Sequence, residues 1–417
     1  MTNVAVIGAG VTGLTTAYEL LDRGFDVTVY DAHRYAAMET SFANGGQLSA
    51  SNAEVWTQWG TVLKGLKWML QADAPLLVNP APTLHKMRWM MEFLSNIPNY
   101  WRNTVETVRL AIAARAVLFE MAEREGIDFD LERRGILHFY GNEKDLAHAR
   151  KVNALLTEGG LDRREVSVEE MREIEPALRG DFVGGFMTPS DSSGDIHKFT
   201  AGLARACRRR GAELRFGTRV EELEAIGGGE RVDTSNGIET FDKVELSAGA
   251  RWRESARQLG DRVNIYPVKG YSITVALEDD ESRAAAPWVS LLDDRAKIVA
   301  SRFGENRFRI AGTAEFSGAN RDIKADRIRP LTAWCERFFP GVSTENVTPW
   351  AGLRPMMPSM LPRVGRGRAE GVFYNTGHGH LGWTLSAATA RLVAGAAAGE
   401  DRPARAAVAG HRPTAAA

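Results

Sequence analysis

Arg354 is the side chain of this sequence best suited to bind a carboxylate. It lies in the segment Gly352-Leu353-Arg354-Pro355, where the proline restricts the backbone. A planar guanidinium binds a carboxylate through two parallel hydrogen bonds and thereby fixes the orientation of the bound molecule. The commoner role of an arginine is a structural salt bridge, and the residue type alone leaves both roles open.

Lys269, Tyr271 and His380 are the other candidates for chemistry. Lys269 and Tyr271 lie in the run 265–275, which predicts a strand, and could orient an amine or a carboxylate. The sequence supports equally well a tyrosine packed in a sheet beside a solvated lysine. His378 and His380 could donate hydrogen bonds from a glycine-rich turn, although histidines there more often hold the loop together. The sequence contains no Ser-His-Asp arrangement or metal-ligand cluster, so no metal is expected.

A glycine-rich turn near the N-terminus has the spacing of a dinucleotide-binding motif. The run Val4–Ile7 predicts a strand that leads through Gly8, Gly10 and Gly13 into a helix. Gly8 permits the sharp turn, Gly10 keeps side-chain atoms away from a pyrophosphate, and Gly13 lets helix and strand approach closely. The N–H groups at the start of the helix, from Val11 onward, then favour an anion.

An acidic residue stands where such a fold binds ribose. Residues 25–30 alternate as a second strand, which ends at Asp31 and Ala32. The Asp31 carboxylate can accept hydrogen bonds from two ribose hydroxyls. This favours an adenosine ribose without a phosphate, as in FAD or NAD, over NADP.

Three further segments could lie against a flat cofactor. Residues 39–48 form a polar, glycine-rich loop, although a surface turn would have the same composition. Its candidate contacts are Ser41, Asn44, Gly45, Gly46, Gln47 and Leu48. The predicted strand 243–247 runs into Ala248 and Gly249, whose small size lets the backbone approach a cofactor. The predicted strand 372–375 enters a turn at the start of a helix, which favours an electron-rich group. That turn supplies Gly377, His378, Gly379, His380, Leu381, Gly382 and Thr384.

The order of the predicted elements indicates a discontinuous nucleotide-binding domain. Helices are predicted at 104–125, 143–157, 195–210, 325–338 and 381–395. Short strands at 265–275, 288–292, 297–302 and 307–313 form a sheet-rich module. The predicted fold class is therefore α/β, with a Rossmann-type domain in 1–50, 150–250 and 350–400 and an α+β substrate domain in 51–149 and 251–349. NAD dehydrogenases usually keep the nucleotide fold contiguous, so the interruption favours FAD.

Composition excludes several classes of function. The 417 residues carry 52 basic and 53 acidic side chains, and no basic stripe indicates nucleic-acid binding. Cys207 and Cys335 are far apart and outside any CxxC pair, so neither a zinc site nor a disulfide framework is expected. No signal peptide precedes the first strand, and a cytoplasmic location is expected. Residues 402–417, rich in Ala, Pro and Arg, are expected to be disordered.

Residues 55–101 are rich in tryptophan and methionine. They contain no apolar run of the ~20 residues that a membrane span requires. We expect a helical excursion that packs on the body of the protein or covers the active site. The alternative is a peripheral contact with the inner face of the cell membrane, with Lys64, Lys67, Lys86 and Arg88 as its basic residues.

Five blocks of the sequence occur together in a characteristic order. They are VAVIGAGVTGLTTAYEL, TSFANGGQLSASN, VKGYSIT, WAGLRPMMP and NTGHGHLGWTLS, and they span nearly the whole chain. In these blocks the chain resembles the bacterial D-amino acid dehydrogenase (small subunit) family of the D-amino-acid oxidase-like flavoproteins. The resemblance implies a non-covalent FAD in a glutathione-reductase-type nucleotide domain. It also implies oxidation of a D-amino acid by hydride transfer from Cα to flavin N5, hydrolysis to a 2-oxo acid and ammonia, and transfer of the electrons to a quinone or an artificial acceptor.

The resemblance also implies roles for individual residues. The first glycine turn and Asp31 hold the ADP half of FAD, Val220 and Ala248-Gly249 flank the adenine side, and the 41–48 loop and the 377–384 turn meet the isoalloxazine. The GLRP match favours Arg354 as the carboxylate anchor. Where the family commonly has Pro-Asp-Gly-Thr-Pro after GLRP, this chain has Pro358-Ser359-Met360-Leu361-Pro362, which leaves the substrate range open.

Two other functions fit the same sequence. The first is a flavin oxidase of secondary amines such as sarcosine, N-alkyl amino acids, D-proline or opines, which peroxide formation under air would favour. The second is a flavin-binding electron carrier without turnover, which failure of every amino acid to bleach the flavin would favour. The preferred side chain, the electron acceptor and the oligomeric state do not follow from the sequence.

Overall fold

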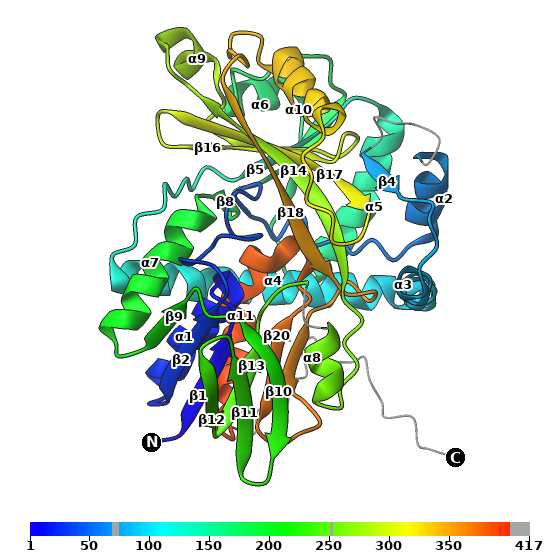
Figure 1. Ribbon diagram of the computed structural model, residues 1–417. Coiled ribbons are helices and arrows are strands. Elements are labelled where there is room, and N and C mark those ends of the chain that lie inside the picture. Colours follow the sequence, from blue (N-terminus) through cyan, green and yellow to red (C-terminus); the bar gives the residue numbers. More distant parts are fainter. Residues whose placement is uncertain (69–74, 251–252, 401–417) are drawn as a thin grey trace.

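The computed structural model describes residues 1–68, 75–250 and 253–400, and of residues 66–68 only the backbone. Within these residues the chain forms two bodies, each built around one large sheet (Figure 1). The lower body contains the N-terminus and a six-stranded sheet, and the upper body contains a nine-stranded sheet. The tail that we predicted to be disordered, 402–417, lies outside the described residues.

The sheet of the lower body is parallel except at one edge. Its order is β19-β20-β13-β1-β2-β9, and β19 runs antiparallel to β20. Its strands are β1 (Asn3–Ile7), β2 (Asp26–Asp31), β9 (Glu213–Phe216), β13 (Lys243–Leu246), β19 (Arg363–Arg366) and β20 (Val372–Thr376). The central strands are buried on both faces, which explains why they read as continuous apolar runs.

Helices cover one face of this sheet and a small sheet covers the other. The helices are α1 (Val11–Asp22), α4 (Tyr100–Glu125), α7 (Ile196–Arg209) and α11 (Gly382–Ala397). They share one apolar core with the strands. The small sheet consists of β10 (Val220–Ile226), β11 (Gly229–Thr234) and β12 (Gly237–Phe241). It buries Leu223, Val232 and Phe241 against Ala5 and Ile7 of β1.

The sheet of the upper body has the order β18-β14-β17-β16-β15-β5-β7-β6, and β4 pairs with β17. Its strands are β4 (Leu76–Val78), β5 (Ile136–Tyr140), β6 (Arg164–Val166), β7 (Gly184–Thr188), β14 (Tyr266–Ala276), β15 (Ser290–Asp293), β16 (Ile298–Phe303), β17 (Arg307–Phe316) and β18 (Val347–Met356). The helix α10 (Ala325–Phe338) packs its apolar face on β14 and β17. The long strands β14 and β18 run down toward the lower body (Figure 1).

The remaining elements are mostly short. They are β3 (Gln47–Leu48), α2 (Trp59–Trp68), α3 (Leu84–Ser95), the 3-10 turn η1 (Ile97–Asn99), α5 (Glu143–Glu158), α6 (Val168–Ile174), β8 (Ser192–Ser193), α8 (Arg253–Gln258), α9 (Asp280–Ala285) and the 3-10 turn η2 (Gly379–Leu381). A capping box at Ser167 begins α6, and Asn236-Gly237 forms the turn between β11 and β12. The predicted α/β fold class with a Rossmann-type domain is confirmed, whereas the short helices α8 and α9 were not predicted.

The division of the chain between the two bodies differs from the predicted boundaries. The strands β6 and β7 come from the predicted nucleotide piece 150–250, but they pair with β5 in the upper sheet. The helix α4 comes from the predicted substrate piece 51–149, but it packs on α11 and α7 of the lower body. A local pattern predicts that a segment is a strand or a helix, but not which sheet or helix it packs against, and this explains both differences.

Candidate active site

The three glycines of the first turn have different surroundings. Gly8 has φ +112°, and a Cβ on Gly13 would overlap the carbonyl oxygen of Gly8. These two glycines therefore serve the backbone of the turn itself. A Cβ on Gly10 would meet only the Ser41 Oγ, at 3.5 Å. The space beside Gly10 thus remains open for the pyrophosphate that the motif predicts.

Asp31 and Ser41 hold this turn from two sides. The Asp31 carboxylate accepts hydrogen bonds from the N–H of Ala9 at 2.7 Å and of His33 at 2.8 Å. A carboxylate has about four acceptor positions, so two stay available for ribose hydroxyls. Ala32 beside it is exposed. Ser41 Oγ accepts from the N–H of Val11 at 3.0 Å. We predicted Ser41 at the isoalloxazine, but this bond places it at the N-terminus of α1.

The residues predicted at the adenine side lie together. Val220 and Ala248 pack against the same apolar cluster of β1, β13 and the small sheet. Gly249 has φ +64°, and a Cβ there would meet no atom within 4 Å. Its carbonyl oxygen accepts from Thr376 Oγ1 at 3.4 Å, so β13 and β20 end side by side. Open space at Gly10 and Gly249, with helix N–H groups between, fits an extended dinucleotide.

The loop at 44–48 crosses between the two bodies. Gly46 N–H donates to Asn44 Oδ1 at 2.9 Å, and Gln47 Nε2 donates to Ser290 Oγ at 2.9 Å. A Cβ on Gly45 would overlap Val299, and one on Gly46 would overlap Phe303, both on β16. We predicted that these glycines make room for a flat ligand. In the structure they also let β16 of the upper body approach. Leu48 pairs with β8 and is buried.

The turn before α11 contains two histidines with different roles. His378 is buried, contacts Thr389 Oγ1 at 3.0 Å, and holds the turn to α11. Burial lowers the pKa of His378 to about 3. His380 lines a cavity, stacks on Trp56 at 4.9 Å and donates from Nε2 to the Asn52 carbonyl at 3.2 Å. Burial lowers the pKa of His380 to about 4, so both rings are neutral at physiological pH.

The rest of that turn supports the backbone and the cavity wall. Gly377 and Gly379 have φ +79° and +61°. Gly382 is the first residue of α11. Leu381 and Thr384 line the same cavity as His380, and Thr384 Oγ1 accepts from the N–H of Ser49 at 3.2 Å. The predicted contact segments 44–48 and 379–384 therefore meet at one cavity.

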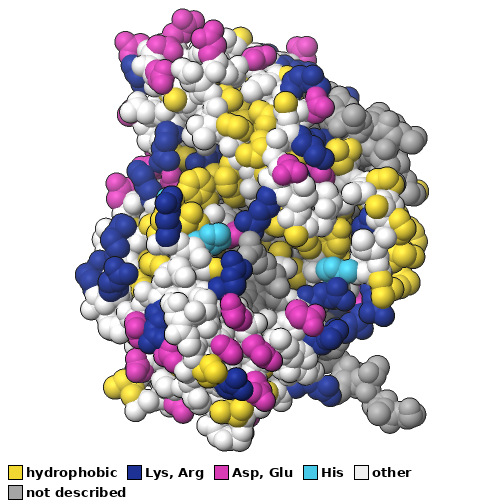
Figure 2. All heavy atoms as spheres, in the orientation of Figure 1, with side chains coloured by type: hydrophobic (Ala, Val, Ile, Leu, Met, Phe, Trp, Pro, Cys, Tyr) yellow, Lys and Arg dark blue, Asp and Glu magenta, His cyan; other side chains and the backbone are white. Residues whose placement is uncertain are grey.

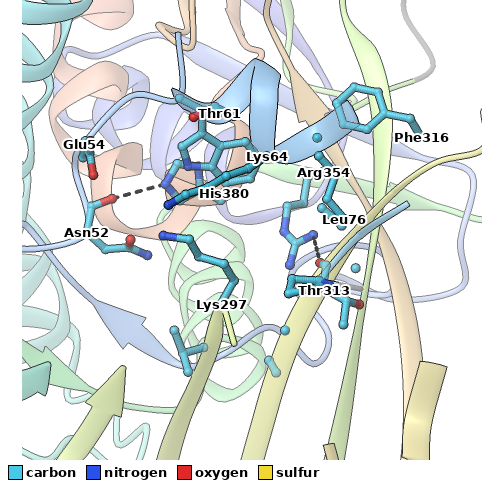
Figure 3. Close-up of a pocket in the computed structure, with 18 of the residues that line it drawn as sticks. Asn52, Glu54, Thr61, Lys64, Leu76, Lys297, Thr313, Phe316, Arg354 and His380 are labelled. Carbon is cyan, nitrogen blue, oxygen red and sulfur yellow. Dashed lines mark hydrogen bonds between the residues drawn. The ribbon is translucent and has the colours of Figure 1, made fainter. Parts of the chain in front are cut away.

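Arg354 points into this cavity from β18 (Figure 3). Its Nη1 donates to the carbonyl oxygen of Thr313 at 2.9 Å. Burial lowers the pKa of the guanidinium to about 10, so the side chain stays cationic at neutral pH. No carboxylate of the described residues forms a salt bridge with Arg354. A desolvated cation without an anionic partner is costly, which indicates that a carboxylate arrives from outside.

The backbone around Arg354 leaves space for its guanidinium and fixes its direction. In the β14–β18 ladder, Val268 pairs with Arg354 and Gly270 pairs with Gly352, so these residues share one face. A Cβ on Gly270 would overlap all the terminal atoms of the Arg354 guanidinium. Thr313, which accepts its hydrogen bond, has φ +60° where the β14–β17 register shifts. This bulge and this glycine together set the direction of the guanidinium.

We expect Gly270→Ala to displace the Arg354 guanidinium and to lower kcat/KM by roughly 10- to 100-fold, because a ~1 Å misplacement of a positioning group is enough for such a loss. FAD binding and the melting temperature should change little, since the new methyl group meets only the end of a flexible side chain. Steady-state kinetics with a flavin absorbance spectrum measures both. Wild-type kinetics in this variant would show that the space at Gly270 is not needed to position Arg354 for catalysis.

Lys269 and Tyr271 lie on the other face of β14. Side chains alternate along a strand, and both contact Glu315, which pairs with Lys269 on β17. The Tyr271 hydroxyl donates to Glu315 Oε2 at 2.8 Å, and Lys269 Nζ donates to Asn320 Oδ1 at 2.7 Å. Tyr271 lines the cavity but its hydroxyl is held by Glu315, whereas Lys269 is not among the lining residues. The predicted role in orienting the substrate therefore finds no support for Lys269 and stays a prediction for Tyr271. The alternative of a packed tyrosine fits, but the lysine is fully buried and ion-paired instead of solvated.

The cavity has a volume of about 1190 Å³, and described residues of the excursion 55–101 form part of its wall. Trp56, Leu76, Trp89 and Phe93 of this excursion all line it. The expectation that the excursion covers the active site thus agrees with the lining. Lys86 is buried and donates to the carbonyl oxygens of Asn79 and Ala81, so it is not the surface cation that the membrane alternative required. The Lys67 side chain lies outside the described residues.

Comparison with known proteins decides the family. The sequence matches the family described as FAD dependent oxidoreductase (DAO) over residues 3–396. The chain belongs to this family. It is therefore an FAD-dependent enzyme, and the cofactor and family expected from the sequence are confirmed.

Relatives of this FAD-dependent oxidoreductase support the same placement. It is 61% identical to a Mesorhizobium japonicum protein named D-amino acid dehydrogenase 3, over 94% of this chain and 96% of that one. A D-amino acid dehydrogenase of Paramagnetospirillum magneticum is 40% identical over 94% of both chains. The fold is similar to that of glycine oxidase from Geobacillus kaustophilus, with a TM-score of 0.77, 21% identity, and coverage of 97% of this chain and 96% of that one.

Several site residues of this oxidoreductase were not predicted. Gly270, which leaves space for the Arg354 guanidinium, lies inside the VKGYSIT block, and this block was the signal that could have identified it. Asn52 is the last residue of the TSFANGGQLSASN block, but only the fold reveals that its carbonyl holds His380. Nothing in the sequence marks Thr313, whose role depends on a bulge. Cys207 and Cys335 are buried free thiols. Among the described helices, none combines the length and the apolarity needed to cross a bilayer.

Proposed function

We propose that this protein oxidises D-amino acids to 2-oxo acids and ammonia. The observation that carries the proposal is Arg354, a desolvated cation in a cavity that lacks an anionic partner among the described residues. An amino acid supplies that partner through its carboxylate. The names of the two relatives, which both say D-amino acid dehydrogenase, support a D-amino acid as the ligand.

The residues of this chain bind and orient the substrate. Arg354 holds the carboxylate, and because the Thr313 carbonyl and Gly270 fix its guanidinium, the Cα of the substrate is held in one position. His380 stays neutral, so it adds no positive charge that would repel the substrate amine. Bound FAD accepts the hydride of the Cα–H bond and thereby supplies the redox chemistry. The turn before α11 presents helix N–H groups, which favour negative charge beside them.

Anaerobic titration of the yellow holoenzyme tests this proposal. We expect D-amino acids to bleach the flavin absorbance and their L-enantiomers to leave it unchanged. Faster bleaching by sarcosine or D-proline, with peroxide formed under air, would favour the secondary-amine oxidase instead. If no amino acid bleaches the flavin, the protein is an electron carrier and the proposal fails.

We also propose a peripheral contact with the membrane through an apolar patch, with a quinone as the acceptor. The patch consists of Trp59, Leu63, Leu84, Met87, Met91, Leu94 and Trp101, which are 41% to 66% exposed. Apolar side chains gather at the edge of the molecule where α2 and α3 lie (Figure 2). Arg88 and Lys64 are exposed cations beside them. Met87 and Leu94 also line the cavity, so the patch adjoins its mouth and a lipid-soluble acceptor could reach it.

We expect the protein to float with liposomes that contain anionic lipid. The double variant Trp59→Ser/Met91→Ser should lower the recovered fraction several-fold, because two large apolar side chains leave the contact. Ile238→Ser, which removes an exposed apolar side chain on β12, is the matched control and should float as the wild type does. No recovery of the wild-type protein with lipid would contradict the patch.

A further inference from the structure

The two sides of Arg354 differ in polarity. Leu76 and Phe316 lie on one side of Arg354, whereas Asn52, Glu54, His380 and Lys297 lie on the other (Figure 3). All of them line the same cavity. A ligand with its carboxylate on Arg354 therefore meets an apolar region in one direction and a charged region in the other.

The apolar region is a continuous wall, which we call the apolar chamber. It consists of Leu76, Val78, Trp89, Phe93, Ala314 and Phe316. In the pairing of β4 with β17, Leu76 is opposite Ala314 and Val78 is opposite Phe316. The chamber begins one residue after Thr313, whose carbonyl holds Arg354. It thus starts directly beside the proposed carboxylate site.

Aromatic side chains close the far part of the chamber. Trp89 lies 5.3 Å from Phe316 and 5.4 Å from Phe93, measured between ring centroids. Its indole N–H donates to the Met356 carbonyl at 2.8 Å, so this polar group is already satisfied. Lys86 also lines the cavity, but its ammonium is held by the backbone carbonyls of Asn79 and Ala81.

The other side of Arg354 offers polar partners. Glu54 Oε1 accepts from the Tyr100 hydroxyl at 2.7 Å and from Gln58 Nε2 at 2.8 Å, which fixes the carboxylate at the cavity. Lys297 is ion-paired with Asp294. A substrate amine is compatible with these carboxylates but not with the chamber, because burying a charged or polar group among apolar side chains without a partner is costly.

We propose that the apolar chamber binds the side chain of the substrate, and that the preferred substrates are D-amino acids with a large, uncharged aliphatic or aromatic side chain. This inference rests on the proposed function, because it takes Arg354 as the carboxylate site. The cavity volume of about 1190 Å³ leaves room for such a side chain, and small or charged side chains would gain nothing from the wall.

Binding of unreactive carboxylates to the holoenzyme tests the chamber without turnover. The flavin difference spectrum would give Kd for acetate, butanoate, pentanoate and hexanoate. We expect Kd to fall about fourfold per methylene, the equivalent of ~0.8 kcal/mol for each CH₂ that leaves water. Glutarate, which has the chain length of pentanoate and a second carboxylate, should bind at least about tenfold more weakly. A flat series, or glutarate binding as tightly as pentanoate, would overturn the inference.

Two variants test whether the dependence of Kd on chain length arises in the apolar chamber. Leu76→Ala should raise the Kd of hexanoate roughly five- to tenfold and the Kd of acetate less than twofold, because only the longer chain reaches the chamber. Ile238→Ala removes an exposed side chain far from the cavity lining and should leave the whole series unchanged. Equal losses for acetate and hexanoate in Leu76→Ala would contradict a chamber that binds the side chain.

Turnover of D-amino acids, measured beside the carboxylate series, distinguishes a failure of this inference from a failure of the proposed function. We expect kcat/KM to rank D-leucine above D-alanine and D-alanine above D-glutamate. If the carboxylate series holds but no amino acid bleaches the flavin, the chamber stands and the proposed function fails. If D-amino acids bleach the flavin but the series is flat, the function stands and the chamber fails.

Discussion

Arg354→Lys should lower kcat/KM for D-amino acids by about 30- to 1000-fold, or ~2 to 4 kcal/mol, while FAD stays bound. The guanidinium binds a carboxylate through two parallel N–H donors, and a lysine ammonium is a single point charge that cannot reproduce this geometry. The shorter reach also loses the hydrogen bond to the Thr313 carbonyl, which sets the direction of the side chain. Arg354 is partly buried, so the lost hydrogen bonds are only partly replaced by water.

Kinetics and spectra of the same preparation measure this effect. The flavin absorbance should match that of the wild type, since no predicted cofactor contact is changed. Arg329→Lys is the matched control, because Arg329 is an exposed arginine on α10 that pairs with Asp326 at the surface. Unchanged kinetics in Arg354→Lys would remove Arg354 from the site and with it the main support for the proposed function.

Gly10→Ala and Gly13→Ala should both weaken FAD binding, but for different physical reasons. A methyl group at Gly13 would overlap the Gly8 carbonyl oxygen, and backbone cannot move aside as a side chain can. We therefore expect Gly13→Ala to lower the melting temperature of the apoprotein as well as its FAD content. At Gly10 a methyl group meets only Ser41 Oγ at 3.5 Å, and the backbone angles of φ −77° and ψ 179° suit any residue.

The Gly10 variant isolates the contribution of the ligand. We expect the apoprotein of Gly10→Ala to melt as the wild type does, while its affinity for FAD falls on the order of 100-fold, or ~2.7 kcal/mol. Quenching of FAD fluorescence gives the affinity, and circular dichroism gives the melting temperature. Wild-type affinity in Gly10→Ala would show that the pyrophosphate does not lie there. A wild-type melting temperature in Gly13→Ala would contradict the close approach of helix and strand.

The turns and side chains at the ends of strands could be predicted because each depends on a short, contiguous segment. The strand, glycine turn and helix of residues 3–22 are contiguous, and Gly8 and Gly13 are required by the backbone of the turn itself. The same holds for Asp31 at the end of β2 and for the turn before α11. Arg354 was marked by its neighbours in the GLRP segment, and the structure places it in the cavity as a cation that no described carboxylate pairs.

The hydrogen-bond partners of Lys269, Tyr271 and Ser41 could not be predicted from short segments in the same way. Lys269 and Tyr271 are the immediate neighbours of Gly270 along the strand, yet both contact Glu315 on the other face of the sheet. Which face is the cavity face depends on how β14 pairs with β17 and β18. Ser41 was assigned to the ring, but the fold of its loop brings it to the first turn of α1.

The sequence by itself determined the cofactor class, and it marked the two glycine turns and Arg354 as the residues proposed to meet the cofactor and the carboxylate. These features depend on contiguous residues, where backbone geometry and side-chain type act within a few positions. Only the tertiary structure decided which face of β14 is functional, that the Thr313 bulge and Gly270 seat Arg354, and that the excursion 55–101 supplies an apolar wall. Those features come from pairing between strands far apart in the chain, and no local pattern records the partner of a strand.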